Sequence, residues 1–371
     1  MKIAIVHPKF GALGGASIVM RDMVHALAAD AANSITVFAR EWRGDIPAAV
    51  RFEKLNPFYV GSLMRAWTFE RAARRIDRCA FDLVLSDQKI AGIDVYFAGG
   101  GVHVEWTRRK LRDAPWWRKL FERIEPRNRY WQKAEQRLFQ SDALRAVVCV
   151  SETVRRDVLR HFALPPERVH VVYNGIDLLR FDPAFRTRQR GRLRDEMGLG
   201  DKLVLLFIGG GMRNKGILET LDAAARSGLD FELLVVGKDK HLALFRAAAQ
   251  ALGIAQRCRF VGPQADVLPY YAVADIFVMP SHFETFGLVY LEALAMGVPV
   301  LVSKAAGAAE LIEDGRHGYR IDPDNVDDIV AKMQRLSRTA PLMAADCIAL
   351  AQRFSREAMA ERLAAVLSRI A

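Results

Sequence analysis

Residues 279–300 read Met-Pro-Ser-His-Phe-Glu-Thr-Phe-Gly-Leu-Val-Tyr-Leu-Glu-Ala-Leu-Ala-Met-Gly-Val-Pro-Val, and this stretch decides the fold. The apolar run Ile276–Met279 leads into it and is typical of a buried strand. A helical pattern follows from Leu288 to Met296 and is ended by Gly297 and Pro299. The stretch therefore predicts strand, loop, helix and strand in succession, which is the repeating unit of an α/β domain.

Two carboxylates flank the turn at the centre of this stretch. Glu284 lies in the loop, whereas Glu292 lies in a helix whose other residues are apolar, where a carboxylate needs a partner. Backbone N–H groups at a helix start favour an anion, and glycine lets a ligand approach the backbone closely. We expect Glu284 to bind sugar hydroxyls and Glu292 to bind a ribose diol, although a salt-bridged helix residue is the alternative for Glu292. The amides expected to bind phosphate belong to Thr285, Phe286, Gly287 and Leu288.

Length and composition limit the number of domains, the extent of disorder and the kind of partner that can be expected. A chain of 371 residues favours two domains, since single cores seldom grow beyond about 250–300 residues. With 51% apolar and 26% charged residues, disorder is not expected to dominate. Lysine and arginine number 54 against 43 acidic residues, so the net charge of +11 indicates an anionic partner such as nucleic acid, a phosphorylated glycan or an acidic membrane surface.

The cysteines indicate neither a disulfide framework nor a metal site. The residues Cys79, Cys149, Cys258 and Cys347 are scattered, without a C-x-x-C pair or a histidine cluster, which fits a reducing cytoplasm. The opening apolar run is read as a first buried strand rather than a signal peptide, and no run approaches the roughly 20 residues of a membrane span. We therefore expect no metal or other cofactor, and only peripheral contact with a membrane.

The N-terminal half begins with a strand at Ile3–Val6, followed by a loop that contains Gly14 and Gly15. Such a turn before a helix is the usual place for phosphate in a parallel sheet, although it is also a common packing feature and does not match G-x-G-x-x-G. Further on, His103 follows three glycines at 99–101. It is a candidate for the site, with a purely structural histidine as the alternative.

The segment from Trp106 to Lys133 has the most unusual composition, since ten basic residues face three acids and four of the six tryptophans lie here. Aromatic rings settle at the headgroup level of a bilayer and basic residues are attracted to anionic lipid. We interpret the segment as a membrane or acceptor contact; the alternative is a solvated basic helix pair with inward tryptophans. Basic residues interleaved with aromatic ones also suit single-stranded nucleic acid, but nothing else in the chain supports that ligand. The candidate contacts are Arg108, Arg109, Lys110, Trp116, Trp117, Arg118 and Lys119.

The C-terminal half has a second strand and glycine-rich turn, after an arginine-rich stretch at 184–200 that we interpret as a linker. The strand 203–208 runs into Gly209, and Arg213 and Lys215 follow before a helix begins. Two cations and a helix N-terminus therefore lie close together, which favours the binding of a phosphate. The alternative is a turn with solvent-exposed charges. Two further strands end at Gly237 and Gly262, where we expect the base and ribose of a nucleotide. Asp322-Pro323-Asp324 is interpreted as a turn and helix cap rather than a metal site.

The spacing Glu284-x7-Glu292 resembles the motif of retaining glycosyltransferases of family 4, which have the GT-B fold. The segments 42–47 (Trp-Arg-Gly-Asp-Ile-Pro) and 92–98 (Gly-Ile-Asp-Val-Tyr-Phe-Ala) are similar to stretches of bacterial lipopolysaccharide core glucosyltransferases. The chain departs from that group at Ala16-Ser17, where an acidic residue is expected, and at Gly99-Gly100, where Ala-Asp is expected. These departures bear on the acceptor and on part of the sugar contact.

The resemblance implies an α/β protein with two Rossmann-like domains that face each other across a cleft. Residues 1–183 would bind the acceptor, with the C-terminal helix 353–371 packing back on them, and residues 184–352 would bind a nucleotide sugar. Lys215 and Arg213 would hold the donor diphosphate without a metal, His103 would contact the transferred sugar, and the Gly14-Gly15 loop would face the donor.

The resemblance also implies a reaction. A hexose, expected to be glucose from UDP-glucose, would pass with retention to a lipopolysaccharide core or similar glycolipid acceptor on the cytoplasmic face of the inner membrane. The alternative is a family 4 transferase that uses UDP-galactose, UDP-GlcNAc or GDP-mannose as the donor and a lipid or polysaccharide as the acceptor. The partners would be a nucleotide sugar, the acceptor and an anionic membrane surface, with no nucleic acid.

Two other classes of function remain as alternatives. A nicotinamide oxidoreductase would need a stricter glycine fingerprint with an acidic residue about 20 positions later. A membrane-binding module without catalysis would bind vesicles but would gain no thermal stability from UDP-sugars.

Overall fold

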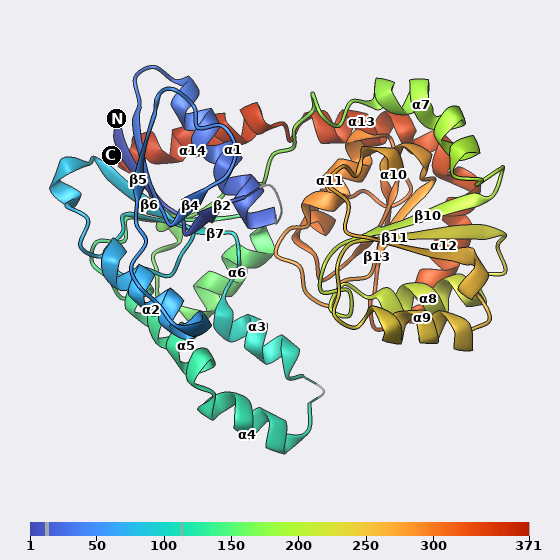
Figure 1. The fold of residues 1–371 in the computed structure, drawn as a ribbon, viewed down its shortest axis with the longest axis horizontal. Helices are drawn as coiled ribbons and strands as arrows, with labels where there is room; N and C mark the ends of the chain where they lie inside the picture. The colour runs from blue at the N-terminus through green and yellow to red at the C-terminus, as the bar shows by residue number, and fades with distance from the viewer. Residues whose placement is uncertain (12–14, 113, 371) are drawn as a thin grey trace. The chain divides into compact units, whose positions relative to one another are not determined.

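The computed structural model describes residues 1–11, 15–112 and 114–370. The chain divides into two compact units (Figure 1), the first formed by Met1–Asn174 with the residues from Arg356 onward and the second by Gly175–Ser355. The division falls nine residues before the boundary expected from the sequence at 183/184. The segment before Pro183 already contacts the second unit, because Ile176 N donates to the carbonyl of Phe354 over 2.9 Å and the ring of Phe181 lies 5.9 Å from that of Tyr271.

The described part of the first unit contains a seven-stranded parallel sheet with the order β5-β3-β1-β6-β7-β8-β9. Its inner strands β1, β6, β7 and β8 are nearly all apolar and buried, as expected where helices cover both faces of a parallel sheet. The strands are β1 (Lys2–Val6), β3 (Ser34–Ala39), β5 (Val50–Lys54), β6 (Leu83–Ser86), β7 (Val95–Ala98), β8 (Ala146–Cys149) and β9 (Val169–Val171), and a short ladder joins β2 (Lys9–Phe10) to β4 (Glu41–Trp42).

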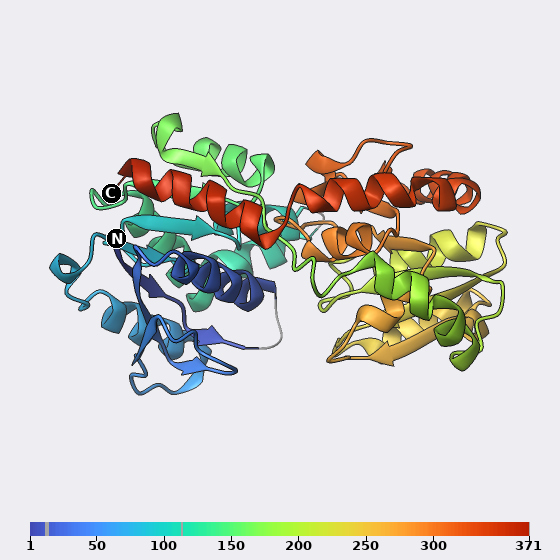
Figure 2. The ribbon, with the colours of Figure 1, turned by 90° about the horizontal axis from the view of Figure 1, so that it is seen from above.

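The last helix of the chain, α14 (Arg356–Ile370), belongs to this first unit. It lies beside α1 (Gly15–Ala29), as Figures 1 and 2 show, and Arg356 Nε donates to Asp22 Oδ2 over 2.9 Å. Among the described residues, no helix is both long and apolar enough to cross a membrane. The other helices of the unit are α2 (Gly61–Ala73), α3 (His103–Lys110), α4 (Trp116–Ile124), α5 (Pro126–Phe139) and α6 (Glu152–His161).

The second unit contains a six-stranded parallel sheet with the order β12-β11-β10-β13-β14-β15. Its helices cover both faces of the sheet, with α8 and α9 on one side and α10 and α11 on the other (Figure 1). The strands are β10 (Leu203–Ile208), β11 (Phe231–Val236), β12 (Cys258–Gly262), β13 (Ile276–Met279), β14 (Val300–Ser303) and β15 (Gly318–Ile321). The helices are α7 (Pro183–Glu196), α8 (Ile217–Arg226), α9 (Leu242–Ala251), α10 (Leu268–Val273), α11 (Leu288–Ala295), α12 (Val326–Thr339) and α13 (Ala344–Gln352).

The prediction of a linker at 184–200 is wrong, because most of this stretch forms α7, which packs on α10. Arginines four residues apart lie on one face of α7 and donate to carbonyls at the end of α10. Arg186 Nη2 reaches the carbonyl of Ala274 over 2.9 Å, and Arg194 Nη1 reaches that of Val273 over 3.0 Å. The last carbonyls of a helix lack partners within the helix, so these arginines are structural.

The strand order of the second sheet brings two loops together. Strand β10 pairs with β11 on one side and with β13 on the other, so the connections from β10 and β13 leave the sheet in opposite directions. Ligands of open parallel sheets bind at such a switch point, beyond the carboxyl ends of the strands. The loops concerned are 209–216 after β10 and 280–287 after β13, and both contain residues that the sequence singled out.

Candidate active site

The loops 209–216 and 280–287 are fixed to each other through their backbones. The carbonyl of Asn214 accepts from His282 N over 2.9 Å, and Asn214 Nδ2 donates to the carbonyl of Phe283 over 2.9 Å. Gly216 has a φ of +78°, and a Cβ at this residue would lie 2.1 Å from the carbonyl oxygen of Pro280. Glycine is therefore required where the two loops cross.

Lys215 and Glu284 meet where these loops touch. Lys215 Nζ forms an ion pair with Glu284 Oε2, and the two side chains are 21% and 16% exposed. Burial lowers the pKa of Lys215 to about 8, so the ammonium form still dominates at pH 7. The adjacent carboxylate favours that charged form. The site thus holds a partly desolvated cation beside an acceptor of hydrogen bonds.

The turn from Glu284 to Gly287 leads into α11. The carbonyl of Glu284 accepts from Gly307 N over 3.1 Å, and the carbonyl of Phe286 accepts from Ala308 N over 2.9 Å. Gly287 has a φ of +95°, and a Cβ there would lie 2.7 Å from the ring of Tyr290. The Phe286 side chain is buried in the core. The turn at Thr285 and the first helical residue, Leu288, therefore have a fixed backbone at the N-terminus of α11.

Glu292 has a hydrogen-bonding partner that the sequence did not reveal. The hydroxyl of Tyr271, on α10, donates to Glu292 Oε2 over 2.7 Å. Burial raises the pKa of Glu292, and the hydrogen bond from Tyr271 opposes this effect. The hydrogen bond from a tyrosine, rather than the salt bridge considered as the alternative, therefore holds this carboxylate on α11.

The three strand-end glycines lie next to one another at the edge of the sheet. Gly209 N donates to the carbonyl of Val236 over 3.0 Å, and Gly237 N donates to the carbonyl of Gly262 over 2.9 Å. A Cβ at Gly237 would lie 2.1 Å from the carbonyl oxygen of Gly209. Side chains are thereby kept away from this edge, which leaves the backbone open to a ligand.

Arg213 is exposed on the same loop as Lys215. The structure adds Asp239, whose Oδ2 accepts from Met212 N over 2.8 Å and holds the loop. It also adds His282, which lies two residues before Glu284.

His282 is held between two carboxylates. Its Nε2 lies 3.0 Å from Glu219 Oε1 and its Nδ1 lies 3.3 Å from Asp324 Oδ1. The hydrogen bond to Glu219 is the main reason why the pKa of His282 is raised. Asp324 N donates to Asp322 Oδ1 over 3.0 Å, as in the predicted turn. His282 therefore ties the loop before Glu284 to α8 and to this turn.

His103, in the first unit, begins α3 and lines a cavity of about 910 Å³. Its Nε2 lies 2.7 Å from Asn128 Oδ1, and its ring stacks on Trp106 with centroids 5.7 Å apart. Burial lowers the pKa of His103, and Lys89 lowers it further, so the imidazole is neutral at pH 7.

Of the glycines expected to face a donor, Gly15 begins α1, whereas Gly14 lies outside the described residues.

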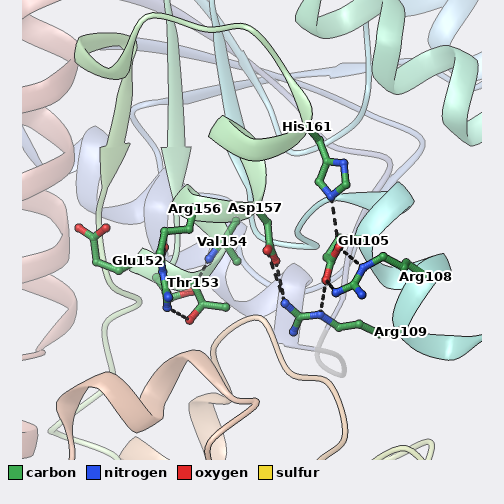
Figure 3. A network of polar contacts seen from close by, with 10 residues as sticks. Glu105, Arg108, Arg109, Glu152, Thr153, Val154, Arg156, Asp157 and His161 are labelled. Carbon is green, nitrogen blue, oxygen red and sulfur yellow. Dashed lines mark hydrogen bonds and ion pairs between the residues drawn. The ribbon is translucent and has the colours of Figure 1, made fainter. Parts of the chain in front are cut away.

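Arg108 and Arg109 pair with acids of their own unit (Figure 3). Arg108 Nη2 lies 2.6 Å and Arg109 Nε 2.7 Å from Oε1 of the buried Glu105. Arg109 also reaches Asp157 on α6 over 3.2 Å, and His161 reaches Glu105 over 3.2 Å. Arg108 is the main cause that lowers the pKa of Glu105 to about 2. Arg109 is 24% exposed, so it contributes to the joint between α3 and α6.

Helix α4 exposes apolar side chains along one face. Trp116 is 75% and Trp117 is 56% exposed, and Leu120, Phe121 and Ile124 follow at helical spacing. The alternative of inward-packed tryptophans is therefore wrong for these two residues. Arg118 and Lys119 are also exposed, and Lys110 pairs with Glu122 over 2.7 Å.

The chain is similar to known glycosyltransferases. Residues 13–180 match the family model described as Glycosyltransferase Family 4, and residues 189–362 match the model described as Glycosyl transferases group 1. The D-inositol 3-phosphate glycosyltransferase of Geodermatophilus obscurus is 29% identical over 96% of this chain and 85% of its own length. The lipopolysaccharide glucosyltransferase WaaG of Escherichia coli is 25% identical over 92% of this chain and 91% of its own length.

Solved structures show the fold. A crystal structure of WaaG superposes with a TM-score of 0.82 at 23% identity and covers 99% of both chains. A structure of Anabaena HepE in complex with UDP and glucose gives 0.74 at 20% identity and covers both chains fully. The predicted fold class, α/β with two Rossmann-like domains as in GT-B glycosyltransferases, is confirmed by these structures. The two family models together span most of the chain, which belongs to the GT-B glycosyltransferases and resembles the family 4 enzymes.

Proposed function

We propose that the protein is a retaining, metal-independent glycosyltransferase that moves glucose from UDP-glucose onto a lipopolysaccharide core or a similar membrane-associated glycan. The observation that carries the proposal is the Lys215–Glu284 pair at the switch point of the second sheet, beside strand-end glycines and the N-terminus of α11. The name of WaaG and the UDP and glucose bound to HepE support the choice of donor and acceptor.

In this proposal the nucleotide and diphosphate of the donor lie on the second unit's loops. The diphosphate binds the Lys215 ammonium and the amides of residues 285–288, and Arg213 adds a second cation. Glu284 accepts hydrogen bonds from the hexose hydroxyls once the diphosphate competes for Lys215. Glu292 binds the ribose diol, and Tyr271 keeps its carboxylate in one orientation over 2.7 Å. Gly237 and Gly262 leave room for the base and ribose.

The chemistry follows from where charge develops. As the bond between the anomeric carbon and the phosphate oxygen breaks, negative charge builds on the leaving β-phosphate, and fixed donors at that point lower the barrier. Lys215 is such a donor. The acceptor hydroxyl attacks from the face that the phosphate leaves, its proton passes to a phosphate oxygen, and the configuration is retained. No protein carboxylate acts as a nucleophile in this scheme.

We further propose that His103 contacts the transferred hexose. Asn128 Oδ1 accepts the N–H of His103 Nε2, so the Nδ1 atom of the neutral imidazole is left to accept a hydrogen bond from a hexose hydroxyl. The three glycines before it keep bulky side chains away from the backbone of this segment.

The exposed face of α4 is proposed to lie on the inner surface of the cytoplasmic membrane. Trp116, Trp117 and Phe121 match the aromatic composition of interfacial helices, and Arg118 and Lys119 supply attraction to anionic lipid. Replacing Trp116 and Trp117 by serine should weaken sedimentation with vesicles containing anionic lipid while the melting temperature stays unchanged. Equal binding of the double variant would contradict the membrane contact.

The donor is tested by a melting-temperature screen against UDP-glucose, UDP-galactose, UDP-GlcNAc, GDP-mannose and ADP-heptose, followed by transfer assays. A ligand that binds only the folded state raises the melting temperature with concentration. UDP-glucose should give the greatest shift, and Lys215→Ala should abolish it. A greater shift with another donor would replace the sugar in the proposal, and no shift with any nucleotide sugar would refute it.

A further inference from the structure

The cavity of about 910 Å³ in the first unit is lined by groups suited to a polar ligand. We propose that this cavity binds a sugar that carries an anionic substituent, a phosphate or a carboxylate, at a corner formed by Arg40, Lys54 and Arg65. The inference rests on the proposed function, since it names the chemical class of the acceptor.

Three separate elements build this corner at the carboxyl edge of the sheet. Lys54 ends β5 and is paired in register with Ala39, directly before Arg40. Arg65 lies on α2 and its backbone carbonyl accepts from Arg40 Nη2 over 2.5 Å. The guanidinium groups of Arg40 and Arg65 lie 4.8 Å and 5.9 Å from the ring centroid of Tyr59. The corner therefore combines three cations with an aromatic surface.

The carboxylates that line the cavity already have partners. Glu41 pairs with Lys9 over 2.9 Å, Asp87 pairs with His7 over 2.8 Å, and Glu70 accepts from the hydroxyl of Tyr130 over 2.7 Å. The other two, on α4 and at the start of α5, are Glu122, paired with Lys110, and Glu125, which accepts from Asn128 N over 2.7 Å.

The cations of the corner lack such partners. In the part of the chain that the structure describes, no ion pair joins Arg40, Lys54 or Arg65 to a carboxylate. Arg40 instead donates to the side chain of Asn56 over 3.1 Å and to the carbonyl of Pro57 over 3.0 Å, which are neutral groups. Four cations that line the cavity have no ion pair within the described residues, and all but Arg127 lie at this corner. Arginine is well suited to recognise phosphate and carboxylate.

The rest of the lining suits a sugar. Trp106 and Trp131 contribute aromatic surface, and His103 lines the same space. Of these groups, His103 is the residue proposed above to contact the transferred hexose. An acceptor held by its anionic group at Arg40, Lys54 and Arg65 would therefore extend within the same cavity towards that histidine.

The test is a titration of the whole chain with glucose 6-phosphate, glucuronate and glucose. Binding is measured by tryptophan fluorescence, because two tryptophans line the cavity. Glucose 6-phosphate should bind at least tenfold more tightly than glucose. Lys54→Gln and Arg65→Gln should each weaken its binding about tenfold, as expected for a hydrogen bond to a charged group. Arg75→Gln is the matched control, because this arginine is exposed and does not line the cavity.

The outcomes show whether the cavity recognises a phosphate or a carboxylate. They also separate the inference about this cavity from the proposed function. Tight binding of glucuronate as well would extend the ligand class to carboxylates, whereas binding of glucose 6-phosphate alone would restrict it to phosphates. Equal binding of glucose and glucose 6-phosphate, no response to any of the three, or an equal loss in Arg75→Gln would overturn the inference. The melting shift of the same samples with UDP-glucose shows separately whether the proposed function holds.

Discussion

Among single substitutions, replacing Lys215 by alanine is the most direct test of how the leaving phosphate is stabilised. Two unit charges about 4 Å apart attract by about 4 kcal/mol at an effective dielectric constant of 20, which suits a side chain that is 21% exposed. Part of this attraction also acts on the bound diphosphate before the reaction. The part specific to the transition state should resemble the loss of one oxyanion donor, about 2.7–4 kcal/mol, or about 100- to 1,000-fold in kcat.

The assay is steady-state transfer from UDP-glucose, with kcat and KM measured separately and the melting temperature recorded beside them. Lys240→Ala is the matched control, because Lys240 is an exposed lysine just after the neighbouring strand β11. It should keep kcat within about twofold, since a screened surface charge contributes little. A Lys215→Ala enzyme that keeps its fold and loses less than threefold in kcat would refute the assignment of this lysine to the leaving phosphate.

Three further predictions follow from contacts within the second unit. Glu292→Ala should raise the KM for UDP-glucose at least tenfold because the ribose loses its acceptor, and an unchanged KM in steady-state kinetics would remove Glu292 from the donor site. Gly216→Ala should lower the free energy of unfolding by about 1–3 kcal/mol in a denaturant titration, since its Cβ would meet the carbonyl oxygen of Pro280; wild-type stability would contradict the crossing of the loops. His282→Gln should lower the melting temperature at pH 6 but not at high pH, because a histidine whose pKa is raised by folding stabilises the protein below its unfolded pKa of about 6.5 and loses that effect as the pH rises through its folded pKa. A melting difference between wild type and His282→Gln that does not depend on pH would show that the imidazolium is not what stabilises the loop.

The strand, loop, helix and strand of 276–303 could be predicted from the sequence because each has a strong local signal. The apolar runs are short and continuous, and Gly287 and Gly297 stand at the helix boundaries. The pairing of Lys215 with Glu284 is a different matter, since 69 positions separate them in the chain. The glycine-rich turn and the E-x7-E spacing indicated that both residues bind a donor, but only the strand order brings them into contact.

Other parts of the site depended on tertiary contacts that leave no local pattern. Glu292 needed a partner, yet nothing in the sequence pointed to Tyr271 on the preceding helix. The arginines of α7 resembled a charged linker because their acceptors, backbone carbonyls and the carboxylate of Asp275, lie about 80 positions later in the chain. Arg109 was grouped with residues that face a membrane, whereas a buried glutamate four positions earlier holds it within the unit.

The central claim is that a leaving pyrophosphate is held by the second unit's loops at Lys215. Crystals of the protein soaked with UDP-glucose test it directly. The account predicts β-phosphate oxygens within about 3 Å of Lys215 Nζ and of amides between residues 285 and 288, with the ribose hydroxyls on Glu292. A nucleotide bound elsewhere, with the space beside Lys215 and Glu284 empty, would contradict it.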